Sequence, residues 1–201
     1  MEPQERWRVQ WLDHPQLPLV LVLDAEDALV YLGFSLETRA RFDDLRAFAA
    51  RHGASVSDEG RGPTAASAQL RAYLAGERRG FDLPLRLLGT AFQRRAWGAL
   101  CEIPYGEIRS YGQQADAMGS TPGAARAVGH ANGQNPVSIV VPCHRVVGGD
   151  GRLVGFGGGV EVKRWLLELE RRRSTPAWSP KPGPRRPVDG EGQLGLFGGG
   201  G

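Results

Sequence analysis

Short apolar runs separated by polar turns open the chain, before longer stretches with helical spacing begin. Three of these runs lie over residues 7–12, 19–23 and 28–34, divided by a Pro-containing turn and an acidic turn. Runs of this length, bounded by turn-forming residues, predict β-strands. Because they follow one another closely, we predict a three-stranded antiparallel meander.

Helical spacing of apolar residues follows the predicted meander. It predicts helices over residues 36–51 and 63–75, divided by a polar loop, and places Tyr73 on the apolar face of the second helix. Residues 81–87 are expected to form a short strand or an extended linker. We therefore predict a small α/β domain over residues 1–86.

From Thr90 onwards the pattern is mainly helical. Helices are expected over residues 91–101, 111–118, 124–132 and 160–173. Thr90 and Ser110 are candidate N-caps, because their side-chain oxygens can accept a free backbone N–H. A Gly-containing turn joins the second and third helices, which predicts a helix-turn-helix. The fold class is α/β (α+β): a small N-terminal antiparallel-sheet domain with helices, then a mostly helical, winged helix-turn-helix-like domain over residues 87–173.

The second helix of this motif carries small side chains around one arginine. Arg126 is flanked by Ala124, Ala125, Ala127 and Gly129. Small side chains let a helix backbone approach another surface closely. That surface is DNA if the motif binds it, or a neighbouring helix if the face belongs to the protein core.

A candidate reactive thiol follows the apolar run 137–141, which predicts a buried strand. The next residues are Pro142-Cys143-His144-Arg145. A thiol packed only for its bulk needs no histidine neighbour. A reactive one benefits from it, because the thiolate is the nucleophile and a nearby base or cation favours it. The other cysteine, Cys101, lies on a predicted amphipathic helix and is expected in the core.

Charge is unevenly distributed along the 201 residues. Residues 1–90 carry 11 basic and 13 acidic side chains, residues 91–173 carry 11 and 7, and the remainder carry 3 and 2. The basic C-terminal half fits a polyanionic partner, although an ordinary mixed surface is the simpler interpretation of charge alone.

Composition excludes several classes of protein. Two cysteines cannot form a disulfide framework or a cysteine-rich zinc site, and we expect a reducing, cytoplasmic setting without metal or cofactor. The apolar stretch over residues 17–23 is too short to span a bilayer, and no secretory pattern precedes it. In residues 174–201, 13 of 28 positions are Pro or Gly, which predicts a disordered tail.

Several segments become distinctive when their order and spacing are considered together. They are Gly89-Thr-Ala-Phe-Gln93, Ile103-Pro-Tyr-Gly106, Ser110-Tyr111, Ala125-Arg-Ala-Val-Gly129, Asn135-Pro136, Val141-Pro-Cys-His-Arg-Val-Val147, Gly157-Gly-Gly159, and Lys163 with Leu166-Leu167 and Glu170. They resemble the O6-alkylguanine-DNA alkyltransferases, or methylated-DNA–protein-cysteine methyltransferases. The preceding meander is similar to that family's N-terminal domain by pattern.

This resemblance implies DNA repair by direct reversal. The damaged nucleotide is flipped out of duplex DNA, and its O6-alkyl group moves to Cys143, once per protein molecule. In the implied mechanism His144 relays the thiol proton through a water, Glu170 orients the imidazole, and Asn135 braces the turn that carries the cysteine. The implied partner is double-stranded DNA containing O6-alkylguanine, bound by a monomer.

The resemblance also implies the contacts to the substrate. Tyr111 donates a hydrogen bond to the departing guanine, Arg126 enters the base stack where the nucleotide was, and Lys163 supports the active-site loop. The base pocket is lined by Val146, Phe156, Gly157 and Gly158. The DNA surface includes Ala124, Ala125, Ala127 and Gly129.

Three features depart from the family pattern. Gly157 stands where some members have serine, and Phe156 stands where tyrosine is frequent, so two hydroxyl groups are lost. Some members bind zinc through N-terminal cysteines, whereas no cysteine precedes Cys101 here. We expect altered substrate preference and no structural zinc.

Thiolate activation alone would add little rate. Lowering a cysteine pKa from about 8.5 to about 6.5 raises the thiolate fraction at pH 7 roughly 25-fold. The lower nucleophilicity of that thiolate reduces this gain by a factor of roughly 8. The net gain is about 3-fold, so most of the rate is expected from positioning and from neutralising charge on the guanine.

Three alternatives stay open from the sequence. A thiol hydrolase would also pair cysteine with histidine, but it usually draws the histidine from a distant segment. A helix-turn-helix regulator or redox sensor would carry the cysteine incidentally. A sensor that binds alkylated lesions without chemistry normally lacks the cysteine.

The predicted tail contains one further motif. Gln193-Leu-Gly-Leu-Phe197 resembles the short peptide by which many bacterial repair and replication proteins dock on the sliding clamp. A tether that ends in apolar anchors suits capture by a pocket. Clamp binding through residues 193–197 is therefore a hypothesis.

Overall fold

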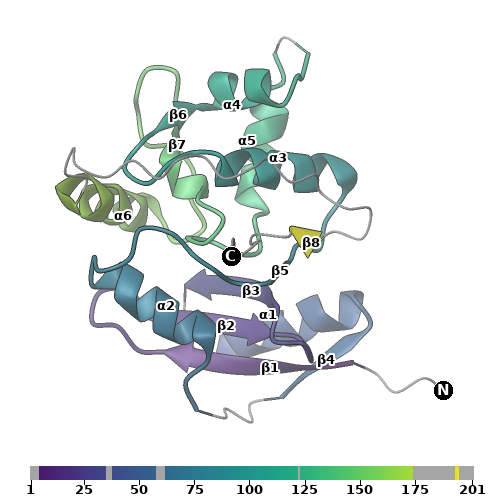
Figure 1. The fold of residues 1–201 in the computed structure, drawn as a ribbon. Coiled ribbons are helices and arrows are strands. Elements are labelled where there is room, and N and C mark those ends of the chain that lie inside the picture. The colour runs from purple at the N-terminus through teal and green to yellow at the C-terminus, as the bar shows by residue number, and fades with distance from the viewer. Residues whose placement is uncertain (1–4, 35–37, 58–61, 122, 174–192, 195–201) are drawn as a thin grey trace, which may run out of the picture.

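The computed structural model describes residues 5–34, 38–57, 62–121, 123–173 and 193–194. A twisted sheet with two helices forms one part, and a group of helices forms the other (Figure 1). No helix within the described ranges has the length and apolar character needed to cross a membrane. The tail predicted to be disordered lies outside the described residues, apart from Gln193–Leu194.

The predicted meander is confirmed. Strands β1 (Glu5–Leu12), β2 (Leu19–Leu23) and β3 (Leu29–Phe34) pair antiparallel in that order. Two short strands extend the sheet beyond β3: β5 (Leu85–Arg86) runs parallel to it, and β8 (Gln193–Leu194) runs antiparallel to β5. With β4 (Ala54–Ser57) beside β1, the sheet has the order β4-β1-β2-β3-β5-β8.

The polar loop predicted between the first two helices is wrong over β4 (Ala54–Ser57). This segment pairs in parallel with β1 and closes that edge of the sheet. Only Ala54 is fully buried, so four residues with mixed polarity give no clear strand pattern. The strand is held by backbone hydrogen bonds to β1, which leave no trace in the hydrophobic pattern.

Helices α1 (Thr38–Arg51) and α2 (Ala65–Leu74) cover opposite faces of the sheet. Alternate residues of β2 point to opposite faces, so Val20 packs with Leu45 of α1 while Leu21 packs with Leu70 of α2. Residues beneath α2 belong to the same hydrophobic cluster as residues of the helical part. Among these are Leu19, Leu21, Trp97, Leu100, Val146 and Leu166. One core thus runs across residue 86, and the division into domains there stays a prediction.

The predicted helix-turn-helix lies in α4 (Tyr111–Ala117) and α5 (Ala125–Gly133), packed on α3 (Ala91–Cys101). Both predicted N-caps are confirmed. The Thr90 side chain accepts a hydrogen bond from Gln93 N at 3.2 Å, and that of Ser110 accepts one from Gln113 N at 3.1 Å.

Two further contacts fix the helical part around the candidate site. The buried side-chain amides of Gln114 and Asn132 bond to each other and hold α4 against α5. Strands β6 (Arg109–Ser110) and β7 (Val146–Val147) pair in parallel and tie the start of α4 to the segment after Cys143. The last helix, α6 (Val160–Arg173), packs against that segment.

The strand predicted over residues 137–141 is wrong, because the segment is a buried turn. Only isolated bridges form there, from Val137 to Leu32 and from Ser138 to Val141. Ile139 has a φ of 73°, in the left-handed region that β-branched residues rarely adopt, and Val141 N donates to Val137 O at 3.0 Å. A buried turn and a buried strand share the same apolar pattern.

Candidate active site

Cys143 begins a 3₁₀ turn, η1 (Cys143–Arg145), directly after the buried turn. Its sulfur lies 3.2 Å from Asn135 Nδ2, which also donates to Val141 O at 2.8 Å. Asn135 Oδ1 accepts from Val137 N at 3.0 Å. One side chain thus closes the turn and holds a donor on the sulfur.

Both thiols have raised pKa values. Burial raises the pKa of Cys143, while the Asn135 hydrogen bond and the Lys163 charge act against this shift. Burial raises the pKa of Cys101 to about 12. A lowered cysteine pKa, as considered from the sequence, is therefore not found: loss of water outweighs the nearby donors. The Cys143 thiol is protonated at neutral pH and must lose its proton during any reaction.

His144 and Glu170 form a fully buried pair, with His144 Nε2 2.9 Å from Glu170 Oε1. An ionised carboxylate only accepts hydrogen bonds, so Nε2 carries the hydrogen and Nδ1 is left as a base. Nδ1 is buried and has no hydrogen-bond partner in the described part of the chain. Burial lowers the pKa of His144, although Glu170 acts to raise it. The structure thus provides a neutral imidazole with one basic nitrogen.

Arg145 completes this pair from the other side. Its Nε lies 3.0 Å from Glu170 Oε2, and its Nη2 lies 2.9 Å from Oε1. Gly106 N donates to Oε2 at 2.9 Å. Burial acts to raise the pKa of Glu170, but His144 and Arg145 hold it well below its usual range. Glu170 is therefore a carboxylate at neutral pH, locked by several donors.

Tyr73 reaches the same carboxylate from α2. Its hydroxyl donates to Glu170 Oε1 at 2.5 Å and lies 3.5 Å from His144 Nε2. The predicted burial of Tyr73 is confirmed, but sequence reasoning missed this contact and the role of Arg145. The available signal was a tyrosine within an apolar helix face, because a buried hydroxyl needs a partner.

Tyr111 and Lys163 meet at one backbone carbonyl. Lys163 Nζ donates to Val154 O at 2.9 Å, and the Tyr111 hydroxyl reaches the same oxygen at 3.4 Å. The Lys163 ammonium lies 5.9 Å from the Tyr111 ring centroid. Lys163 thus holds the loop before α6, in the place expected for a supporting residue.

Three of the remaining pocket residues, Phe156, Gly157 and Gly158, belong to this same loop before α6. The Phe156 ring is 5.3 Å from that of Phe34 and 6.4 Å from that of His144. A Cβ on Gly158 would lie 2.7 Å from the Phe34 ring, whereas one on Gly157 would meet nothing within 4 Å. Val146 is fully buried in the core. The contribution of Phe34, from the N-terminal half, was missed by sequence reasoning.

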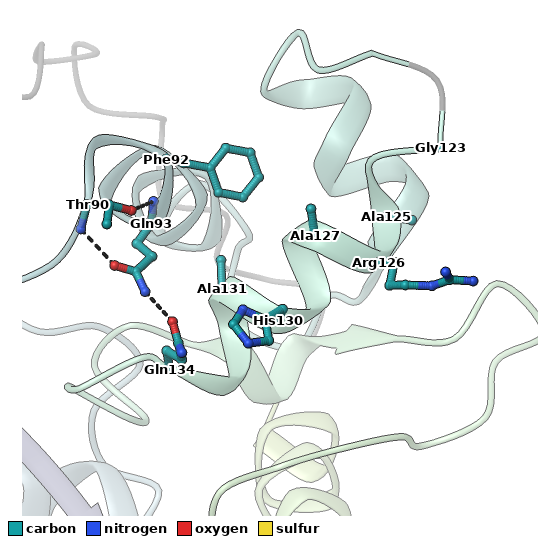
Figure 2. A pocket seen from close by; sticks show the side chains of 10 residues that line it. All are labelled: Thr90, Phe92, Gln93, Gly123, Ala125, Arg126, Ala127, His130, Ala131 and Gln134. Carbon is teal, nitrogen blue, oxygen red and sulfur yellow. Dashed lines mark hydrogen bonds between the residues drawn. The ribbon is translucent and has the colours of Figure 1, made fainter.

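Helices α3 and α5 border a hollow that is open to solvent. A cavity of about 1100 Å³ lies between α3 and α5, with Phe92, Ala127 and His130 around it, and Arg126 extends away from the helix into the open (Figure 2). Arg126 and Ala127 are exposed, while Ala124 and Ala125 are half-buried. A Cβ on Gly129 would lie 3.5 Å from the Tyr111 ring. That distance is an ordinary van der Waals contact, so packing against Tyr111 does not by itself require glycine at this position. The exposed Arg126 and Ala127 are open to a partner.

The helical part matches a family model described as "6-O-methylguanine DNA methyltransferase, DNA binding domain" over residues 91–172. A methylated-DNA–protein-cysteine methyltransferase of Mycobacterium tuberculosis is 62% identical over 106 residues, covering 53% of this chain and 64% of that relative. Its counterpart in Methanosarcina acetivorans is 54% identical over 105 residues, covering 52% and 67%. The chain thus spans about two thirds of the length of these relatives.

Solved structures extend the match across the sheet. The crystal structure of Mycobacterium tuberculosis O6-methylguanine methyltransferase is 45% identical, with a TM-score of 0.69, and the match covers 86% of this chain and 96% of that one. The chain belongs to the methylated-DNA–protein-cysteine methyltransferase family. A methyltransferase of this kind from Pyrococcus kodakaraensis is 27% identical with a TM-score of 0.61, covering 82% and 98%. The methyltransferase fold therefore includes the N-terminal sheet, which confirms the resemblance found in the sequence.

Proposed function

We propose that this protein repairs alkylated DNA by transferring the alkyl group from O6 of a flipped guanine to Cys143 Sγ. The bond between O6 and the alkyl carbon breaks as the bond from sulfur forms. The thiol proton passes through a bridging water to His144 Nδ1 and is then released to solvent, while the departing guanine takes up one proton, so the net reaction moves one proton from sulfur to guanine. Water does not readily cleave the resulting thioether, and each protein molecule acts once.

The observation that carries this proposal is the juxtaposition of Cys143 and its donor Asn135 with the buried His144–Glu170 pair. A protonated thiol beside a neutral base can lose its proton as the alkyl carbon approaches. Tyr111 supplies a hydroxyl for the departing guanine, and Phe156 supplies a face on which the base can stack. Both side chains are held before the reaction, Tyr111 by its hydrogen bond to Val154 O and Phe156 by its contact with Phe34, so the rate comes mainly from positioning.

DNA is the partner we assign to α5. A structure of the Mycobacterium tuberculosis protein OGT in complex with DNA supports this assignment. The exposed, small-sided face around Arg126 and Ala127 lets the helix approach a groove closely. Flipping a nucleotide costs a few kcal/mol, and an inserted Arg126 side chain offsets part of that cost by filling the gap.

Intact mass after mixing with duplex DNA that carries one O6-methylguanine tests the proposal. The expected result is a stoichiometric gain of one methyl group on Cys143, absent in Cys143→Ala and retained in Cys101→Ala. No gain with retained lesion binding would instead indicate a sensor or regulator. No gain and no binding would reject the proposal entirely.

The C-terminal segment supports a second, independent interaction. We propose that the protein acts as a monomer in the bacterial cytoplasm. We also propose that residues 193–197 dock on the sliding clamp there. Gln193–Leu194 pairs with β5, so docking requires that this pairing open. A pull-down in which deletion of residues 193–197 leaves clamp binding unchanged would remove the docking proposal, and light scattering of the free protein measures its oligomeric state.

A further inference from the structure

A hydroxyl from the N-terminal half is part of the buried ion network. Tyr73 lies on α2, while its hydrogen-bond acceptor Glu170 lies on α6, 97 positions later in the chain. Tyr73 is fully buried, and its ring packs 5.1 Å from that of Phe81 and 5.9 Å from that of Tyr105. The ring is thus fixed by packing, and its hydroxyl has a fixed direction.

Glu170 Oε1 receives hydrogen bonds from three side chains, one on α2 and two on η1. The donors are the Tyr73 hydroxyl at 2.5 Å, His144 Nε2 at 2.9 Å and Arg145 Nη2 at 2.9 Å. A fourth, longer bond comes from Arg145 Nε at 3.2 Å. The carboxylate cannot rotate away from His144 without breaking the Tyr73 bond as well. The Tyr73 hydroxyl also lies 3.5 Å from Nε2 itself, so it faces the proton that His144 must keep.

We propose that Tyr73 is a positioning residue for the alkyl transfer, which fixes Glu170 Oε1 and thereby holds His144 in the tautomer whose Nδ1 is the base. In this arrangement the N-terminal half positions the proton relay and is more than a scaffold. The inference rests on the proposed alkyl transfer where it predicts a transfer rate. Its prediction for the ¹⁵N spectrum of His144 does not depend on that function.

The electrostatic consequence has a definite sign. A hydrogen bond donated to Oε1 neutralises part of the carboxylate charge that His144 experiences. Removing the hydroxyl leaves more negative charge beside Nε2, which favours the imidazolium and raises the pKa of His144. The other charged groups facing this network, Arg145 beside His144 and Lys163 on α6, act to lower that pKa and are unchanged by the substitution.

Tyr73→Phe is the test variant, because it keeps the ring and its packing while Oε1 retains the other donors. We expect the single-turnover transfer rate from O6-methylguanine duplex to fall about tenfold, as for loss of a hydrogen bond to a charged group. DNA affinity should be unchanged, and the acidic limb of the rate profile should move to higher pH. Leu74→Ala, on the same helix, destabilises the core without touching Glu170 and should leave rate and profile unchanged.

Side-chain ¹⁵N spectra of His144 give an independent measurement without DNA. The chain has four histidines, and a His144→Gln variant assigns the signal. The wild-type protein should show the Nε2-protonated tautomer, and Tyr73→Phe should titrate at higher pH or show mixed tautomers.

Two results would overturn the role of Tyr73. One is a Tyr73→Phe protein with wild-type rate and wild-type His144 titration. The other is an equal rate loss in Leu74→Ala with no change in the His144 spectrum, which would assign the effect to packing. If the wild-type protein transfers no methyl group, the proposed function fails, while the His144 titration still decides the role of Tyr73.

Discussion

The side-chain amide of Asn135 donates to both the sulfur of Cys143, at 3.2 Å, and the carbonyl of Val141, at 2.8 Å. The same group therefore stabilises a thiolate and the turn that presents it. Because Cys143 is buried, this donor is one of the few that replace water around the sulfur. Geometry and reactivity are coupled through one residue.

Asn135→Ala should slow alkylation of Cys143 by iodoacetamide at neutral pH. Losing about 1.4 kcal/mol of thiolate stabilisation lowers the thiolate fraction about tenfold. The more basic thiolate is more nucleophilic, which raises the alkylation rate almost threefold. The net result is an alkylation rate about fourfold lower than that of the wild-type protein. Gln134→Ala, an exposed neighbour, serves as the control. An unchanged rate–pH profile in Asn135→Ala would show that the contact does not stabilise the thiolate.

The sequence predicts those parts of the fold that local patterns encode. The meander, the caps at Thr90 and Ser110 and the motif around Cys143 all depend on neighbours within a few positions. Residues 137–141 show the limit of this approach. Their apolar run fits a buried strand, yet the left-handed backbone at Ile139 turns the chain back on itself.

Contacts between distant segments were the features that sequence reasoning missed. Tyr73 and Glu170 are far apart in the chain, and Tyr73 fits its helix as an apolar residue. Phe34 fits β3 equally well, although its ring supports the loop at Gly158. The raised pKa of Cys143 comes from its burial, and the histidine beside it in the sequence gives no information on that burial. Each of these properties comes from packing of the two halves.

The folded protein should lose stability as pH falls below about 6.5. Burial lowers the pKa of His144 from 6.5, so the unfolded chain takes up a proton first and is favoured as pH falls. The pKa of Glu170 is also lowered, so its contribution is present above about 4.5 and is lost as pH falls further. Each unit of pKa difference corresponds to about 1.4 kcal/mol.

Urea unfolding between pH 7.5 and pH 4 measures this loss. In His144→Gln the decline between pH 6.5 and pH 5 should shrink, though not vanish, because burial lowers the pKa of His52 as well. The control His130→Gln replaces an exposed histidine of α5 outside the buried network. Equal slopes in all three proteins would mean that His144 does not titrate differently on folding.

Arg126→Ala should slow methyl transfer from duplex DNA while leaving the thiol itself unaffected. Flipping a nucleotide costs a few kcal/mol. If the Arg126 side chain fills the vacated gap and offsets part of that cost, its loss should slow transfer at least about tenfold. Reaction of Cys143 with iodoacetamide should stay at the wild-type rate. Arg46→Ala removes an equal charge from α1 and should change neither measurement. A similar loss in both variants would indicate general attraction to DNA, without insertion.

Adjacent glycines in the pocket loop should differ in their response to the same substitution. Gly158→Ser places a Cβ 2.7 Å from the packed Phe34 ring, and this overpacking should cost about 1–3 kcal/mol of unfolding free energy and slow transfer. Gly157→Ser meets nothing within 4 Å and should change stability by less than about 0.5 kcal/mol. It also restores the hydroxyl that some family members carry. Urea unfolding and single-turnover transfer of methyl and larger alkyl groups measure both effects, and comparable losses in the two variants would contradict this account of Phe34.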